Sequence, residues 1–387
     1  MSILLALLLL QAPQDAIDRG FDHFYNLEFE EAVQLFSSFS QSQPDRAELY
    51  NHLAQAILFR EMLKAGALES ELVTGGNSFL RRPKMNPSAQ DQQRFDQAIA
   101  AAMRLSQASL DKNPDDREGL YDLGVAYSLR ANYNYLVRKA WMDSLRDATA
   151  GRKLHNRLTV LDPNLIDAEL VQGVHDYVIG CLPWYYKAMG FLAGFRGDRE
   201  QGIRTLQEVA TKGDKNRNDA AILLTAIYRR ERRSADAVPL LNGLIAQFPR
   251  NYLLRFELAQ MYGDLGQLPK AMEALAEVER LKQEGLPGFR NMPLEKVYYF
   301  RGSLQFWFDE YEAAVENLGK ATAKAEDLDP NTGIMAWMRL GQTLDLLGRR
   351  RQAMEVYRQA SKYAPGSAVA RESEGYLRSP YRRARTH

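Results

Sequence analysis

The chain has 387 residues, of which 45% are hydrophobic, and its 50 Lys and Arg residues against 49 Asp and Glu residues leave a formal net charge of +1. A nearly neutral chain has no overall attraction for nucleic acid or acidic lipid. The one cysteine, Cys181, excludes an internal disulfide framework and a zinc site built from several cysteines. Helix-forming residues dominate and runs with the period of a strand are missing, so we expect an all-α fold.

Residues 1–12 contain an unbroken apolar run from Ile3 to Leu10. The run is too short to span a bilayer, which takes about 20 residues. Its length fits a secretory signal peptide cleaved after Ala12, although no basic residue precedes it and Pro13 follows that position. We expect a signal peptide and an exported protein, periplasmic or envelope-associated. The alternatives are an apolar helix packed on the first repeat and a cytoplasmic location.

Residues 13–45 have the pattern of one helical hairpin. Its small, aromatic and helix-ending residues stand at offsets that recur later in the chain: Gly20, Ala32, Phe36 and Pro44. A proline cannot continue the hydrogen-bond ladder of a helix, so the second helix should end at the last of these positions.

Residues 46–215 read as divergent helical repeats with three long insertions, at 66–90, 133–150 and 182–202. The first insertion is rich in Gly, Pro and Asn, which predicts a loop. The second contains aromatic residues and most simply lengthens a helix.

The third insertion contains the glycine-rich phrase Gly194–Gly202 with Arg196 and Arg199. Glycines and arginines before a helix can capture an anion. The spacing matches neither a P-loop nor a dinucleotide fingerprint, however. We favour a structural interpretation, in which Asp198 caps the next helix and Gly202 is a small packing residue.

Residues 216–367 contain about four regular units. Six positions of one unit recur 34 residues later: Leu224, Thr225, Tyr228, Ala237, Leu241 and Leu244 return as Leu258, Ala259, Tyr262, Ala271, Leu275 and Val278. The next unit carries Tyr298, Gly302, Ala314, Leu318 and Ala321. The most complete unit carries Trp337, Leu340, Gly341, Leu344, Ala353, Tyr357, Ala360 and Pro365. Large residues on the first helix of each unit should pack against small ones on the second.

These positions resemble the signature of tetratricopeptide repeat proteins. The resemblance implies a right-handed α-solenoid of stacked antiparallel helix pairs with an enlarged, irregular central part, followed by a C-terminal helix and basic tail at 368–387. Through the phrase Leu182–Gly202 the central region also resembles the tetratricopeptide repeat protein 39 family, which implies a repeat scaffold with no known catalytic chemistry.

An enzymatic function has little support in the sequence. The five histidines are scattered without metal-ligand spacing. His175, Asp176 and Cys181 could form a nucleophile with its base, but ordinary residues around a helix end explain them better. We expect no enzymatic activity, no cofactor and no metal.

Stacked helix pairs curve, and their first helices line an extended concave face. The predicted groove residues combine aromatic, charged and amide side chains suited to an extended peptide or a partner helix: Arg229, Phe256, Gln260, Asp264, Tyr299, Ser303, Phe306, Trp307, Met338, Arg339, Gln342 and Asp345. For any single aromatic, packing against the next repeat is the alternative. The Asn residues of a carboxylate clamp are missing, so we do not expect chaperone-tail binding.

Basic clusters occur at 229–233, 349–351 and 382–385. Their positions at helix ends and near the end of the sequence are typical of solvated faces, so we expect no nucleic-acid partner. The sequence thus predicts a non-catalytic scaffold for protein–protein interaction in a bacterial cell envelope. The alternative is an assembly protein that docks on a membrane or a larger complex through its central insertions, without spanning the membrane.

Overall fold

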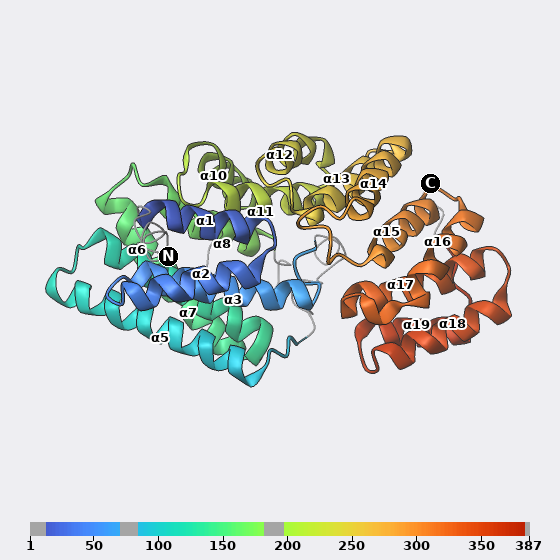
Figure 1. Ribbon diagram of the computed structural model, residues 1–387, viewed down its shortest axis with the longest axis horizontal. Coiled ribbons are helices and arrows are strands. Elements are labelled where there is room, and N and C mark those ends of the chain that lie inside the picture. The colour runs from blue at the N-terminus through green and yellow to red at the C-terminus, as the bar shows by residue number, and fades with distance from the viewer. Residues whose placement is uncertain (1–12, 70–83, 182–196, 384–387) are drawn as a thin grey trace, which may run out of the picture. The chain divides into compact units, whose positions relative to one another are not determined.

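The computed structural model describes residues 13–69, 84–181 and 197–383 (Figure 1). These residues form α-helices joined by short turns and include no strand, and consecutive helices pack against each other. The predicted all-α solenoid of helix pairs is therefore confirmed. The predicted signal peptide, most of the 66–90 loop and most of the 182–202 insertion lie outside the described residues.

The chain divides into two compact units, described here one at a time. Unit 1 consists of Met1–Glu61 and Lys84–Tyr228, and unit 2 of Met62–Pro83 and Arg229–His387. The helices of unit 1 are α1 (Pro13–Tyr25), α2 (Phe29–Ser42), α3 (Ala47–Lys64, its last turn in unit 2), α5 (Ala89–Lys112), α6 (Arg117–Tyr133), α7 (Trp141–Leu161), α8 (Leu170–Gly180), α10 (Arg199–Lys212) and α11 (Arg217–Arg230, its last two residues in unit 2). Those of unit 2 are α12 (Ser234–Gln247), α13 (Tyr252–Asp264), α14 (Leu268–Gln283), α15 (Leu294–Trp307), α16 (Tyr311–Ala323), α17 (Pro330–Leu346), α18 (Arg350–Tyr363) and α19 (Ala368–Arg378).

The structural interpretation of the turn before α10 is confirmed. The Asp198 carboxylate accepts a hydrogen bond of 2.7 Å from the backbone N–H of Gln201, which is an N-cap. A Cβ atom on Gly202 would lie 2.5 Å from the backbone nitrogen of Tyr177, so only glycine allows α8 and α10 to approach this closely.

Most of the insertion at 133–150 is helical and lengthens the helices on either side of it, as predicted: Asn134–Arg138 continues α6, and residues 141–150 belong to α7, which has 21 residues. The break between the two helices was not predicted. After α6 the chain forms a π-helical turn, Asn134–Arg138, and Lys139 adopts a left-handed conformation with φ 56° before α7 begins. The buried Asp147 of α7 accepts hydrogen bonds from Arg130 at 2.7 and 2.8 Å and from Asn134 at 3.0 Å. These hydrogen bonds stabilise the reversal of the chain that packs α7 against α6.

Two close helix contacts in unit 2 place a glycine on the first helix of a pair against a large side chain on the second. A Cβ atom on Gly341 of α17 would lie 2.5 Å from the ring of Tyr357 on α18. Gly302 of α15 stands in the same relation to Leu318 of α16, at 2.7 Å. Both large side chains are fully buried, so each glycine sets the distance between the two helices of its pair.

A buried charge cluster attaches residues 62–69 to the helices of unit 2. The ammonium of Lys296 pairs with Asp329 at 2.8 Å and with Glu69, and these three side chains are 5 to 7% exposed. Burial alone would lower the pKa of Lys296, but the two carboxylates raise it above its ordinary value. Asp329 also caps α17 through the N–H of Thr332 at 2.9 Å. Lys296 is therefore paired with two buried carboxylates, one of which also caps a helix.

We expect Lys296→Met to cost about 3 to 5 kcal/mol of unfolding free energy, because it leaves two buried carboxylates without their counter-charge. The cost should be larger at about pH 8 than at about pH 5, since uncompensated buried carboxyl groups have raised pKa values and are stabilised by protonation. Urea unfolding followed by circular dichroism measures both values. Lys320→Met, which removes an exposed pair with Glu316, is the control and should leave the midpoint unchanged. Equal midpoints for the two variants would contradict this account.

Candidate functional site

The predicted groove residues all belong to unit 2 and lie on the first helices of successive pairs. Arg229 is at the end of α11; Phe256, Gln260 and Asp264 are on α13; Tyr299, Ser303, Phe306 and Trp307 are on α15; Met338, Arg339, Gln342 and Asp345 are on α17. Figure 1 shows α13, α15 and α17 following one another along the unit.

Some of these side chains pack inside the protein. Phe256, Tyr299, Phe306 and Met338 are buried. The ring of Phe256 stacks on that of Phe300 with centroids 4.5 Å apart, so it joins α13 to α15, as the packing alternative expects. Trp307 is different, because 49% of it is exposed.

Three polar members form a first cluster between α11 and α13. Arg229 donates to the Asp264 carboxylate at 3.0 Å and to the Gln260 side-chain oxygen at 2.5 Å. Glu257 lies 3.9 Å from the same guanidinium. The sequence pattern did not select Glu257, although it directly follows the predicted groove residue Phe256 on α13. Arg229 thus faces two carboxylates of α13.

A second cluster surrounds Trp307. The guanidinium carbon of Arg339 lies 4.8 Å from the Trp307 ring centroid and 4.5 Å from that of Phe306, within the range of cation–π attraction. Its Nη1 donates to the Gln342 side-chain oxygen at 3.0 Å. The guanidinium of Arg339 on α17 thus contacts two aromatic rings of α15 and joins the two helices.

Asp345 anchors the end of this second cluster. Its carboxylate is fully buried and accepts hydrogen bonds from Arg350 at 3.0 and 3.1 Å and from the Tyr357 hydroxyl at 3.0 Å. Burial and the Asp345 charge raise the pKa of Tyr357, so the phenol stays protonated and donates. A fourth hydrogen bond comes from the backbone N–H of Tyr381 at 2.8 Å. The sequence prediction did not include residues 379–383, because they follow the last repeat and lie outside its period.

Three predicted groove residues contain a polar atom that is buried and has no hydrogen-bond partner among the described residues: Gln260 Nε2, Ser303 Oγ and Arg339 Nε. They come from α13, α15 and α17 in turn. A buried donor without an acceptor costs about 1 to 3 kcal/mol, and in folded proteins such groups are rare. Other buried polar atoms without a partner occur elsewhere among the described residues, and these three share their position on successive first helices of unit 2.

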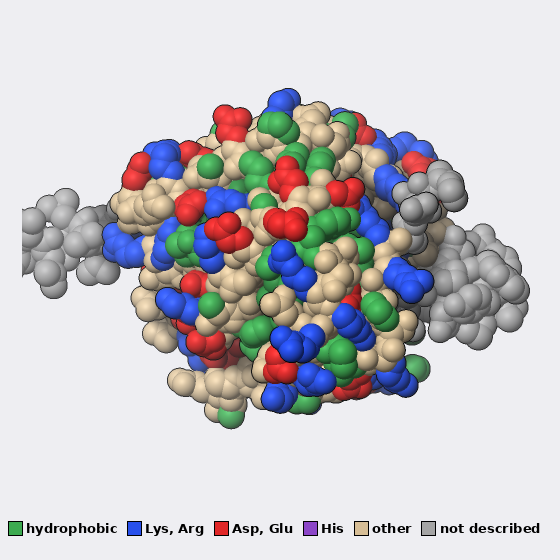
Figure 2. All heavy atoms as spheres, turned by 90° about the vertical axis from the view of Figure 1, so that its right-hand side faces the viewer, with side chains coloured by type: hydrophobic (Ala, Val, Ile, Leu, Met, Phe, Trp, Pro, Cys, Tyr) green, Lys and Arg blue, Asp and Glu red, His purple; other side chains and the backbone are tan. Residues whose placement is uncertain are grey.

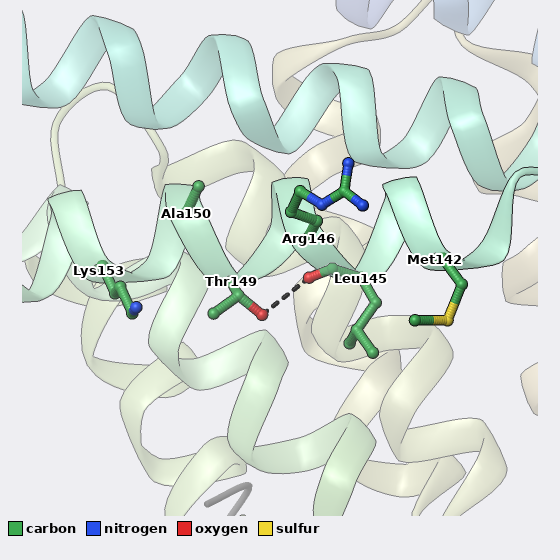
Figure 3. A pocket seen from close by; sticks show the side chains of 6 residues that line it. All are labelled: Met142, Leu145, Arg146, Thr149, Ala150 and Lys153. Atoms are coloured by element: carbon green, nitrogen blue, oxygen red, sulfur yellow. Dashed lines mark hydrogen bonds between the residues drawn. The ribbon is translucent and has the colours of Figure 1, made fainter. Parts of the chain in front are cut away.

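Unit 1 exposes an apolar strip along α7. Met142 is 72% exposed, and Trp141 and Leu145 are also exposed. A hollow of about 360 Å³ is lined by six side chains that all come from this helix, as Figure 3 shows: Met142, Leu145, Arg146, Thr149, Ala150 and Lys153. Because one helix supplies the whole lining, the strip is a surface for contact and not an enclosed cavity.

Charges of both signs mix with apolar side chains on the face of the protein drawn in Figure 2. In the basic cluster at 349–351, Arg350 is paired with Asp345, and Arg349 lies 3.7 Å from Glu312. None of the helices in the described part of the chain has both the length and the apolar character needed to cross a membrane.

Asp345 and Asp309 should respond very differently to the same change. Asp345→Asn should cost about 2 to 4 kcal/mol of unfolding free energy, because it removes the buried charge opposite Arg350 and exchanges an acceptor for a donor. Asp309→Asn should cost less than about 1 kcal/mol, since the Asp309 side chain is 66% exposed. Urea unfolding of the two variants measures both values. Equal losses would show that Asp345 is not an anchor.

Two models of the tetratricopeptide repeat match this chain, over residues 227–285 and 336–367. No curated protein sequence matches it significantly. Similar solved structures include yeast Tom70, at 14% identity with 97% of this chain and 90% of that chain covered and a TM-score of 0.43. They also include a tetratricopeptide repeat protein from Parabacteroides merdae, at 14% identity, 80% and 92% coverage and a TM-score of 0.33. A human IFIT1 dimer with PPP-AAAA has 13% identity, 94% and 84% coverage and a TM-score of 0.46. The chain thus carries tetratricopeptide repeats, a type of repeat that serves as a scaffold for protein interaction.

Proposed function

We propose that this protein is a non-catalytic scaffold that binds an extended peptide or a partner helix along the predicted groove residues of unit 2. The observation that carries the proposal is the set of buried polar atoms without partners on α13, α15 and α17. Gln260 Nε2 and Arg339 Nε are donors, and Ser303 Oγ can donate as well. Extended peptides offer backbone carbonyls at regular intervals, which are the acceptors that these atoms lack.

Trp307 supplies the second element of such a site. A half-exposed indole beside a guanidinium is typical of the few residues that dominate binding energy at interfaces, where Trp and Arg are enriched. The buried ring of Phe306 packs edge-on against the indole, with centroids 5.1 Å apart. Side-chain rotation of Arg339, which contacts the Trp307 ring, would bring its free Nε to a peptide lying beside Trp307.

A second candidate function is assembly through the central insertions, docking on a membrane or a larger complex. It is favoured by the exposed apolar strip of α7, which falls in the insertion at 133–150. Clusters of exposed apolar side chains often mark interaction sites. In this case the predicted groove residues would be incidental.

We also propose that the protein is exported to a bacterial periplasm or envelope. The support is the apolar run Ile3–Leu10, whose length fits a signal peptide. The resemblance of Leu182–Gly202 to the tetratricopeptide repeat protein 39 family supports the scaffold role alone, since that family has no such run.

The double variant Trp307→Ala/Arg339→Ala should reduce capture of the partner at least about tenfold, because it removes both anchor side chains. Immobilised protein is exposed to a cell extract, and the bound proteins are quantified by mass spectrometry. The matched control is Trp141→Ala/Arg146→Ala on α7, since Trp141 is 47% exposed and Trp307 49%. Circular dichroism checks that both variants are folded.

The two variants separate the two candidate functions. Loss of one defined partner with the unit 2 variant alone supports peptide binding by the predicted groove residues. Loss with the α7 variant alone would contradict it and support assembly through the insertion.

Export has its own test. We expect the mature protein, recovered from fractionated cells, to begin at Pro13 and to lie in the periplasmic fraction. Mass spectrometry of the amino-terminal peptide identifies the first residue. A cytoplasmic protein that retains Ile3–Leu10 would refute export and leave the scaffold proposal unaffected.

A further inference from the structure

The chain places one of its own segments on the predicted groove residues. After α19 ends at Arg378, Ser379 is extended, with φ −136° and ψ 126°, and residues 379–383 form no helix. The backbone N–H of Tyr381 donates to the Asp345 carboxylate at 2.8 Å. The Tyr381 ring lies 6.0 Å from that of Phe306 and 5.4 Å from that of Tyr376, centroid to centroid.

Arg383 makes the second set of contacts, two residues further on. Its Nη1 pairs with the Asp309 carboxylate, and its Nη2 donates to the backbone carbonyl of Trp307 at 2.8 Å. Its guanidinium carbon also lies 5.3 Å from the centroid of the Trp307 ring. A tyrosine and an arginine at this spacing therefore cover the ends of α15 and α17.

The receiving surface is held by side chains other than those of the segment. Asp345 keeps Arg350 and Tyr357 as donors, and Trp307 keeps its contact with Arg339. The Tyr311 hydroxyl donates to Asp309 at 2.5 Å. Departure of residues 379–383 would thus leave a formed site with two carboxylates, one indole and one backbone carbonyl ready for a ligand.

The attachment of the segment is weak enough to be exchanged. Arg383 is 32% exposed and its partner Asp309 is 66% exposed, and exposed ion pairs contribute at most about 1 kcal/mol. The segment buries no large aliphatic side chain. A partner that offers the same groups can therefore compete for the site.

We propose that the surface formed by Trp307, Asp309 and Asp345 is a docking site for an extended protein segment in which an aromatic residue is followed two positions later by arginine. Residues 379–383 occupy this site within the same chain and compete with the partner. The proposal rests on the scaffold function and specifies its ligand: the two carboxylates select a basic segment, and the rings of Phe306 and Trp307 select an aromatic one.

The test uses a chain that ends at Arg378 and a fluorescent peptide with the sequence of residues 379–387. Fluorescence anisotropy should show binding to the shortened chain and about tenfold weaker binding to the full chain, because a tethered segment competes at an effective concentration of about 1 mM. In the shortened chain, Asp309→Asn should weaken binding about fivefold. Asp236→Asn, which removes an exposed carboxylate from another ion pair, is the matched control and should have no effect.

Peptides carrying Tyr381→Ala or Arg383→Ala should also bind several-fold more weakly. Failure of a folded, shortened chain to bind the peptide would overturn the proposal, with folding checked by circular dichroism and thermal melting. Equal binding to both chains would overturn the competition within one chain. A dimer of the full chain that is lost on shortening, detected by sedimentation, would also overturn it, because the segment would then occupy the site of a second copy.

These outcomes are separable from a failure of the scaffold function. Partner capture that needs Trp307 and Arg339 but is indifferent to Asp309→Asn would sustain the scaffold and overturn this docking site. Peptide binding without any captured partner would sustain the docking site and overturn the scaffold function.

Discussion

Contact between a glycine on one helix and a large side chain on the next is the constraint from which the binding face of unit 2 follows. Gly341 against Tyr357 and Gly302 against Leu318 bring the two helices of a pair into close contact. The pair then behaves as one rigid block. The predicted groove residues stand on the same first helices, where Phe256 reaches the next first helix and Asp345 reaches the second helix of its own pair.

Sequence periodicity predicted the parts of the fold that depend on near neighbours. The repeats after residue 216, the Asp198 cap and the role of Gly202 all follow from residues a few positions or one helix apart. The pairing of Lys296 with Glu69 does not, because nothing local distinguishes a lysine that will be buried from one that stays in water. The π-helical turn after α6 was missed for the same reason: its stabilising carboxylate, Asp147, lies on the next helix.

For the candidate site, the sequence predicted which helices face the same way but not how deep each side chain would lie. Phe256 and Trp307 were selected by the same rule, yet one is buried between helices and the other is half exposed. This difference in exposure depends on how closely the neighbouring repeat packs against each side chain. The period of the sequence does not specify that distance. The segment at 379–383 could not be expected on this face at all, since its contacts join residues that are far apart in the chain.

The Lys296 cluster has a consequence for how such a protein could have been assembled in evolution. The regular helix pairs are modular, so duplication or recombination could transfer them between genes. A block beginning near residue 229 would nevertheless lose Glu69 and leave Lys296 with a single counter-charge in a buried place. Transfer of this block without the upstream segment would therefore leave a buried lysine short of one of its two carboxylates. The ion cluster makes the helices that contain Lys296 and Asp329 depend on a residue encoded far upstream, Glu69.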